Sequence, residues 1–520
     1  MITFYDTTLR DGAQREGIAL SAEDMLKIAV KLDSLGMDYI EGGFPGSNPR
    51  DREFFANAAE VGLQAKLVAF GNTRRKHIKP EEDPTLQALV EVGTPAVCIF
   101  GKSWDLHVSE ALLTTDEENL KMISDSVKFL KDHGLEVIYD AEHFFDGWGA
   151  NREYALETIK AAEDAGADWI VLCDTNGGWL PNELQAVVEE VVGLTKAPIG
   201  IHAHNDSECA VANTLVAVAA GATQVQGTVN GYGERCGNAN ICSIIANLEL
   251  KAGIEAFGPE KLGQLTDLSH YVAEVANVIP DNHQPYVGQS AFAHKGGVHI
   301  SAIKRNSSAY EHVDPAIVGN FPTIIASDLS GSATIVHKAR EIGVELSEKK
   351  DKVAELLIKL KSKTKEGYSY DAADGSLGVF ILKNTGAYKP LFKLESYEVT
   401  DHRRRSGVTE SQAVVKIRLG DERFVAVGEG NGPVNALDRA LRQALRSAEP
   451  LVDKIHLTDY KVRVINQSRG TRAKVRVFIE STDGEATWGT IGVHENVIEA
   501  SWEALVDGLE YGLARLKGFG

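Results

Sequence analysis

The stretch FYDTTLRDG, residues 4–12, combines the end of a β-strand with a charged turn. The run from Ile2 to Thr8 is typical of a strand, and Arg10, Asp11 and Gly12 follow it closely. A cation, a carboxylate and a flexible glycine contribute little to a packed core. At the end of a strand they can instead place a metal ligand and an anion-binding group above a sheet. An ordinary charged turn has the same composition, so this interpretation depends on matching ligands elsewhere in the chain.

The alternation of a short apolar run with an amphipathic segment continues from residue 1 to about residue 252. Near-continuous apolar runs are typical of parallel strands that are covered on both faces. Several of the intervening helices are expected to end at a glycine in the left-handed conformation. The predicted strands are 2–8, 39–45, 65–71, 96–102, 136–142, 169–175, 199–205 and 224–231, and the glycines are Gly36, Gly93, Gly134, Gly166 and Gly221.

Eight strand–helix units in about 250 residues predict an α/β fold of the TIM (β/α)8 barrel type. A doubly wound open sheet is the alternative, but no GxGxxG motif follows the first strand. In a barrel the carboxyl ends of all strands converge on one mouth, where catalytic groups are found. The polar residues at strand ends therefore predict one site: Arg10 and Asp11, Glu142 and His143, Asp174 to Asn176, His202 to Asp206, and the loop 231–240.

His202 and His204 are two residues apart on the seventh predicted strand, so both side chains leave the same face. Two such histidines and a carboxylate form a three-point site for a divalent cation, which leaves positions for water and substrate. Asp11 is the predicted carboxylate. The sequence therefore predicts a metal site between the first and the seventh strand.

The loop GYGERCGNAN at 231–240 is rich in glycine, so its backbone can make tight turns with positive φ. Asn238 could reach the metal directly or through water as a neutral oxygen ligand. Glu234 and Arg235 are expected to pair with each other and orient the loop. A purely structural loop that packs on the seventh strand is the simpler alternative.

FYDTTLRDG at 4–12, HAHND at 202–206 and GYGERCGNAN at 231–240 together resemble the DRE-TIM metallolyases. The chain is most similar to the Claisen-condensing branch, which contains the isopropylmalate, homocitrate and citramalate synthases. AEHFFDG at 141–147 and FAHKGGVHISA at 292–302 favour the citramalate synthases, which use pyruvate. The resemblance implies an acyltransferase that condenses acetyl-CoA with pyruvate to (R)-citramalate and then hydrolyses the thioester. Such a step begins a threonine-independent route to isoleucine.

The resemblance also implies roles for the residues at the predicted metal site. Asp11, His202 and His204 would bind a divalent cation, with Asn238 completing or backing the site. Mn, Mg, Zn and Co remain open as its identity. Arg10 would bind substrate and stabilise the oxyanion that forms in the reaction.

Four further residues match family positions at the substrates. Glu142 and Thr175 would hold the keto acid or a water on the metal. His299 would be part of the base that takes a proton from the acetyl methyl group, with Tyr310 assisting. A histidine suits this role because imidazoles exchange protons near neutral pH.

A linker region and an internal repeat follow the barrel. Residues 281–330 read as a linker, which in the family reaches over the active site of a partner subunit. Helices are predicted at 333–343 and 347–364, before a break at YDAADGSLG, residues 370–378. From about residue 390 a βββα unit occurs twice, first as strands 392–399, 413–419 and 423–430 with helix 433–447, then as strands 456–465, 473–481 and 486–493 with helix 496–515.

The predicted organisation is a catalytic barrel at 1–280, linker subdomains at 281–385 that partly cover the active site, and a C-terminal α+β domain at 390–520. The repeated unit resembles the allosteric domain of the isopropylmalate synthase group. That resemblance implies a homodimer and a pathway end product as effector, which for citramalate synthesis would be isoleucine.

Composition and charge restrict the class of protein. The formal net charge is −20, from 54 basic and 74 acidic side chains, which argues against nucleic-acid and membrane-surface binding. No run approaches the ~18 apolar residues of a membrane helix. Five cysteines without a regular framework indicate reduced thiols, and the strand pattern at the first residues leaves no room for a signal peptide. A cytoplasmic protein is therefore expected.

Several functions compete with this interpretation. An aldolase or acyl-CoA lyase of the same superfamily would share the barrel motifs, but a repeated C-terminal domain favours a regulated biosynthetic step. Isopropylmalate and homocitrate synthases differ mainly in the keto-acid pocket, and one methylene discriminates by only ~1–3 kcal/mol. A non-catalytic amino-acid sensor is the remaining alternative, and the intact predicted metal triad argues against it.

Overall fold

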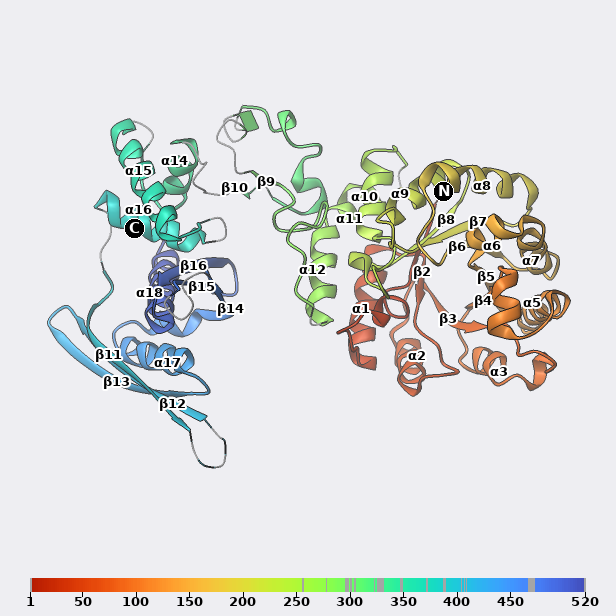
Figure 1. Cartoon of the computed structure of the whole chain (residues 1–520), viewed down its shortest axis with the longest axis horizontal. Helices are drawn as coiled ribbons and strands as arrows, with labels where there is room; N and C mark the ends of the chain where they lie inside the picture. The colour runs from red at the N-terminus through yellow and green to blue at the C-terminus, as the bar shows by residue number, and fades with distance from the viewer. Residues whose placement is uncertain are drawn as a thin grey trace. The chain divides into compact units, whose positions relative to one another are not determined.

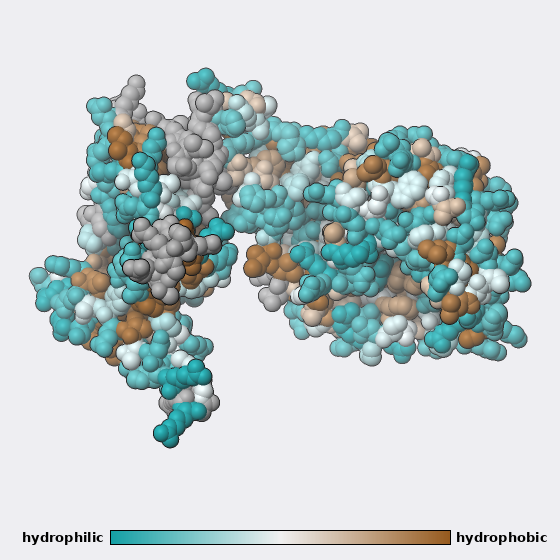
Figure 2. All heavy atoms as spheres, viewed as in Figure 1, coloured by the Kyte–Doolittle hydropathy of each residue, from teal (hydrophilic) through white to brown (hydrophobic). Residues whose placement is uncertain are grey.

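The computed structural model describes residues 2–254, 257–276, 278–294, 299, 302–303, 305–321, 323–324, 332–346, 349–370, 373–386, 390–403, 405, 407, 409–465 and 473–518. The chain forms two compact units, Met1–Phe292 with Val313–Phe321 and Ala293–His312 with Pro322–Gly520 (Figure 1). Across the described ranges, no helix is long and apolar enough to cross a membrane. Hydrophilic side chains dominate the face in Figure 2, with apolar ones scattered between them.

The first unit contains a closed barrel of eight parallel strands in sequence order, in which β1 pairs with both β2 and β8. The predicted TIM barrel is confirmed, and each predicted strand contains an observed one or overlaps it. The strands are β1 (Thr3–Asp6), β2 (Tyr39–Glu41), β3 (Lys66–Asn72), β4 (Ala96–Lys102), β5 (Glu136–Glu142), β6 (Trp169–Asp174), β7 (Ile199–Ala203) and β8 (Gln224–Gly227).

Helices surround these strands in Figure 1. All five predicted stop glycines have positive φ, between 76° and 112°, as the left-handed end of a helix requires. The helices are α1 (Ala22–Leu35), α2 (Pro49–Val61), α3 (Pro84–Glu91), α4 (Asp105–His107), α5 (Asp116–Asp132), α6 (Phe144–Ala150), α7 (Arg152–Asp164), α8 (Pro181–Leu194), α9 (Ala210–Ala219), α10 (Ile241–Leu250), α11 (Gly258–Leu262) and α12 (Leu265–Val275).

Helix α1 shows how the sequence specifies these elements. Ser21 and Asp24 form a reciprocal capping box that satisfies free N–H groups of the first turn. Met25, Ile28 and Leu32 recur at helical spacing and are fully buried. The capping residues and the apolar spacing in the sequence therefore both predict the helix that the structure shows.

The barrel has separate inner and outer packing layers. A buried cluster that includes Tyr5, Phe70, Cys98, Val171 and Cys173 fills the interior, and a larger cluster packs the strands against the helices. Because side chains alternate along a strand, the inward positions form layers stacked along the barrel. Buried polar side chains interrupt this apolar interior: Glu41 of β2, His202 of β7, and Gln224 and Gln226 of β8. These polar residues belong to the site described below.

The second unit contains the predicted βββα repeat, and both copies are confirmed. Each copy is a three-stranded antiparallel sheet followed by a helix. The first copy is β11 (Lys393–Arg403), β12 (Thr409–Leu419), β13 (Glu422–Gly430) and α17 (Pro433–Arg446), and the second is β14 (His456–Val464), β15 (Val475–Thr482), β16 (Thr487–His494) and α18 (Val497–Leu516).

Two helices before the repeat agree with the sequence, but the predicted break does not. Helices α14 (Ser332–Glu341) and α15 (Lys350–Glu366) overlap the predicted ones, whereas α16 (Asp374–Thr385) begins within the supposed break. Its glycines mark close packing and not a turn. A Cβ on Gly375 would lie 2.9 Å from the Gly489 carbonyl oxygen, and one on Gly378 would lie 2.7 Å from the Tyr511 ring.

Candidate metal centre

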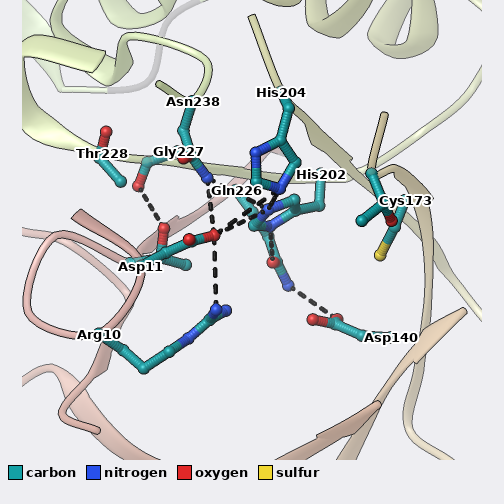
Figure 3. Close-up of polar contacts among 12 residues, drawn as sticks. Arg10, Asp11, Asp140, Cys173, His202, His204, Gln226, Gly227, Thr228 and Asn238 are labelled. Atoms are coloured by element: carbon teal, nitrogen blue, oxygen red, sulfur yellow. Dashed lines mark hydrogen bonds and ion pairs between the residues drawn. The ribbon is translucent and has the colours of Figure 1, made fainter. Parts of the chain in front are cut away.

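Asp11, His202 and His204 meet at the carboxyl ends of β1 and β7 (Figure 3). The Asp11 backbone N–H donates to the Thr7 carbonyl at 2.9 Å, so the turn after β1 holds the carboxylate in place. His202 lies on β7 and His204 directly follows it, with both rings on the same side. All three residues are buried, at 3%, 4% and 7% exposure. The structure therefore brings the predicted metal triad together.

The ligand atoms are spaced as a single cation requires. His202 Nε2 lies 3.2 Å from Asp11 Oδ2 and 3.3 Å from His204 Nε2, and His204 Nε2 lies 4.0 Å from Asp11 Oδ2. With metal–ligand bonds of about 2.0–2.2 Å, neighbouring ligand atoms lie about 2.8–3.6 Å apart. Two of the three separations already fit, and the third needs a shift of a few tenths of an ångström.

Asn238 backs the carboxylate of this group. Its side-chain amide donates to Asp11 Oδ2 at 2.8 Å, and its Oδ1 is buried without a hydrogen-bond partner among the described residues. A bridge between Asn238 and His204 ties the glycine-rich loop to the end of β7. Gly233 has a φ of +157°, and a Cβ there would lie 2.0 Å from Asn238 Oδ1. Only glycine at this position lets the loop approach the site so closely.

The charges of Asp11 and His204 suit metal binding. Burial lowers the pKa of His202, but the hydrogen bond and charge of Asp11 outweigh burial and raise it, so a cation would have to displace a proton from this ring. Burial alone would raise the pKa of Asp11, but Arg10, His202 and His204 hold it well below its usual range. Burial lowers the pKa of His204 to about 3, and the neighbouring His202 adds to this effect. Asp11 is therefore anionic and His204 neutral near pH 7, which are the protonation states in which these side chains bind metals.

Arg10 lies beside the triad and is held by a carboxylate that sequence reasoning missed. Its Nη1 is 3.4 Å from Asp11 Oδ2, and its Nε donates to Glu41 Oε1 at 2.5 Å. Glu41 is fully buried at the end of β2 and also accepts a hydrogen bond from the Tyr5 hydroxyl at 2.6 Å. The guanidinium also lies 3.8 Å from the centre of the Phe70 ring. Glu41 lies at the end of β2, and the ends of the second, third and fourth strands were not among those from which the site was predicted.

Glu142 and Thr175 lie at neighbouring strand ends of the same mouth. Glu142, the last residue of β5, forms an ion pair with Lys102, the last residue of β4. The Thr175 hydroxyl follows β6 and accepts a hydrogen bond from the His143 backbone N–H at 2.8 Å. Both residues are half-buried, so both can face a substrate in the mouth. Lys102 was not anticipated from the sequence.

The expected pairing inside the loop 231–240 is wrong. Arg235 donates from Nε and Nη2 to the two oxygens of Asp206, at 2.7 and 2.8 Å, and not to Glu234. Its Nη2 also donates to the Thr175 carbonyl at 2.7 Å. Asp206 presents both carboxylate oxygens to the planar guanidinium, a geometry that favours a two-bond pair. Arg235 thus links the loop to the ends of β6 and β7.

His299 and Tyr310 belong to the second compact unit. Their rings stack with centroids 4.2 Å apart and an interplanar angle of 26°. Both side chains are exposed. The structure therefore pairs the two predicted catalytic residues with each other, while most of their neighbours in 295–301 lie outside the described residues.

Three parts of the chain match described protein families. Residues 1–272 match the HMGL-like family, and residues 286–367 match the homocitrate synthase post-HMGL domain-like family. Residues 371–513 match the LeuA allosteric (dimerisation) domain. The barrel with its Asp11, His202 and His204 group and the repeated C-terminal domain are thus each similar to a known family.

Similarity to curated proteins extends over nearly the whole chain. An (R)-citramalate synthase of Aquifex aeolicus is 52% identical over 517 residues, which cover 99% of this chain and 98% of that protein. An (R)-citramalate synthase of Geobacter sulfurreducens is 49% identical over 515 residues, covering 99% and 98%. A probable 2-isopropylmalate synthase of Methanopyrus kandleri is 33% identical over 509 residues, covering 98% and 97%.

Proposed function

Because the chain belongs to the HMGL-like family and, within it, to the (R)-citramalate synthases, we propose that it condenses acetyl-CoA with pyruvate to give (R)-citramalate and CoA. A bond forms between the methyl carbon of acetyl-CoA and the keto carbon of pyruvate. The methyl carbon loses one proton and the keto oxygen gains one. Water then cleaves the carbon–sulfur bond of the thioester and releases CoA and the new carboxylate. The reaction would begin a threonine-independent route to isoleucine.

The observation that carries this proposal is the buried Asp11, His202 and His204 group beside Arg10 at the barrel mouth. The three side chains would hold the cation, and Asn238 would fix the Asp11 carboxylate that helps to bind it. A bound divalent cation supplies Lewis-acid polarisation of the keto-acid carbonyl. Mn, Mg, Zn and Co all remain candidates, because the imidazole and carboxylate donor set accepts each of them.

Arg10 would stabilise the negative charge that develops on the keto oxygen as the carbon–carbon bond forms. Its guanidinium has five N–H donors, and Glu41 and Phe70 hold it in one orientation. A donor that is already oriented toward developing charge costs no reorganisation during the reaction. Glu142 and Thr175, at the adjacent strand ends, would hold the keto acid or an ordered water.

The keto-acid preference is tested by the release of CoA from acetyl-CoA in the presence of Mn²⁺. Pyruvate is expected to support release at least tenfold faster than 2-ketoisovalerate or 2-ketoglutarate at equal, subsaturating concentration. The size of this ratio follows from the ~1–3 kcal/mol that a pocket gains or loses per methylene. Release only with 2-ketoisovalerate or only with 2-ketoglutarate would instead identify an isopropylmalate or a homocitrate synthase. CoA-independent cleavage of a hydroxy acid would indicate an aldolase.

His299 would act as the base that removes a proton from the acetyl methyl group, with Tyr310 holding its ring. His299→Ala is expected to lower kcat by about 10²-fold or more, because a positioned base contributes about 10²–10⁴-fold. The KM for pyruvate is expected to change little. His283→Ala, which removes another exposed histidine of the linker region, serves as the control and should leave kcat unchanged. Unchanged turnover in His299→Ala would remove this assignment.

The C-terminal domain would bind isoleucine as an end-product effector and form a homodimer, as its match to the LeuA allosteric (dimerisation) domain suggests. A cavity of about 530 Å³ lies between α17 and β14, a size that suits a small ligand. Asp438, Arg442, Asp453, His456 and Tyr460 are among its lining residues, which include side chains of both charges. Within the protein, Arg442 pairs with Asp438 and Asp453 pairs with Arg446. Isoleucine added to the pyruvate assay is therefore expected to inhibit more strongly than leucine or valine.

A further inference from the structure

His202 has a hydrogen-bond partner on each side of its imidazole ring. Its Nε2 faces Asp11 and His204, and its Nδ1 lies 2.8 Å from Gln226 Oε1 (Figure 3). A carboxamide oxygen only accepts hydrogen bonds, so Nδ1 carries the hydrogen in this contact. The lone pair of the neutral ring is then on Nε2, the nitrogen that faces the metal site.

The Gln226 amide is itself held in one orientation. Its nitrogen donates to Gln224 Oε1 at 3.2 Å and to Asp140 Oδ1 at 3.4 Å. Rotation of the amide by 180° would place its oxygen against these two oxygens and its N–H groups against the N–H of His202. Gln224, Gln226 and Asp140 are all buried, at 0%, 1% and 4% exposure, so water does not readily replace these contacts.

Strand register explains why these side chains meet. His202 on β7 is the direct cross-strand neighbour of Gln226 on β8. Gln224 lies two residues earlier on β8, and therefore on the same inward face. Asp140, on β5, reaches the same amide from across the barrel. The contact to His202 is therefore a property of the barrel wall and not of a loop.

We propose that Gln226 is a positioning residue that selects the His202 tautomer and ring plane required for metal binding, with Asp140 and Gln224 fixing its amide. This inference rests on the metal centre of the proposed function. Outer hydrogen-bond partners of a metal-binding histidine typically change metal affinity by about 10–100-fold. His204 differs, because its Nδ1 is buried without a hydrogen-bond partner among the residues that the structure describes. His202 is thus the oriented imidazole of the pair.

The amide also differs in charge from the carboxylate that often supports a metal-binding histidine. Gln226 orients His202 without adding a second negative charge beside Asp140. A glutamate at this position would keep the acceptor for His202 Nδ1 but would lose the donor to Asp140 and Gln224. Gln226→Glu therefore tests the acceptor to His202 separately from the donors to Asp140 and Gln224.

The test is calorimetric titration of Mn²⁺ into full-length protein from which metal has been removed. Gln226→Met keeps the side-chain volume but removes the acceptor, and it is expected to weaken the Mn²⁺ Kd by about 10–100-fold. Thr158→Val removes a buried hydroxyl of α7 that bonds Ser103 and the Ala155 carbonyl and none of the triad residues. Its Kd is expected to stay within about threefold of the unmodified protein. Gln226→Glu is expected to recover most of the affinity.

Each outcome has a separate meaning. Equal Mn²⁺ affinity in Gln226→Met and Thr158→Val would overturn the inference while leaving the metal centre intact. Failure of Gln226→Glu to bind more tightly than Gln226→Met would also overturn it, because the acceptor would then be irrelevant. Absence of Mn²⁺ binding by the unmodified protein would refute the metal centre and with it the proposed mechanism. Thermal unfolding of each metal-free variant shows whether it is folded, and Gln226→Leu, which also lacks the acceptor for His202 Nδ1, serves as the test if Gln226→Met is not.

Discussion

Asp11→Asn is expected to lower kcat for citramalate formation by about 10³-fold or more. The substitution keeps the size of the side chain but removes the only anionic member of the metal triad. Lewis-acid polarisation is worth several kcal/mol, and about 1.4 kcal/mol corresponds to a factor of ten in rate. Steady-state release of CoA from acetyl-CoA and pyruvate measures this loss. Treatment of the unmodified protein with a chelator should reproduce it, and added Mn²⁺ should restore the rate.

Asp168→Asn is a matched control for this substitution. Asp168 precedes β6, at the amino end of the barrel strands, where its carboxylate accepts a hydrogen bond from the Val137 backbone and pairs with Lys131. Its replacement is expected to lower stability slightly and to leave kcat within a few fold. Full turnover by chelator-treated protein would show that no metal takes part, and the proposed chemistry would then be lost.

Arg10→Gln is expected to lower kcat by about 10²–10³-fold, the loss found when one donor to a developing oxyanion is removed. The KM for pyruvate should change less than kcat, because the charge that Arg10 meets appears mainly in the transition state. Arg10→Lys should restore little, since a lysine cannot reproduce the planar guanidinium that contacts Asp11, Glu41 and Phe70 together. Arg15→Gln removes a cation from the same loop and is expected to be nearly fully active.

Stability must be separated from catalysis in this experiment. Loss of Arg10 leaves Glu41 as a buried carboxylate without its cation, which typically costs about 3–5 kcal/mol. The double variant Arg10→Gln with Glu41→Gln removes both charges and should regain most of the thermal stability, while kcat stays low. Recovery of kcat in the double variant would contradict the oxyanion role, because the defect of Arg10→Gln would then be one of folding.

The barrel could be predicted because each of its signals is local. Apolar runs, helical periodicity and stop glycines such as Gly36 and Gly166 depend on neighbours in sequence, and the structure bears them out. Helix α16 could not be predicted in the same way. Gly375 and Gly378 indicate a break when read alone, whereas their function is to let a helix approach Gly489 and Tyr511, which are more than 100 residues away.

The same distinction between local and non-local signals applies to the residues of the site. Asp11, His202 and His204 could be found because their chemical types stand out at strand ends, and strand ends of a barrel meet. Their supporting residues could not. Glu41 and Gln226 follow from which side chains face each other across the barrel wall, and no spacing in the sequence reports that. The partner of Arg235 was missed for the same reason, since Asp206 is 29 residues away.

Helix α16 also determines where the chain can be divided. Leu377, Val379 and Ile381 of this helix are buried in the same apolar cluster as residues of both βββα copies. The Ser376 hydroxyl donates to Asp507 of α18 at 2.9 Å and accepts from the Ile491 backbone N–H of β16 at 3.0 Å. Cutting the chain between α16 and β11 would remove this helix and expose the apolar side chains that it covers. Burial of each such side chain contributes about 1.5–3 kcal/mol to stability. An excised effector-binding fragment would therefore have to retain α16, as the family match at 371–513 does. A boundary drawn at the first repeat strand would yield an aggregation-prone polypeptide.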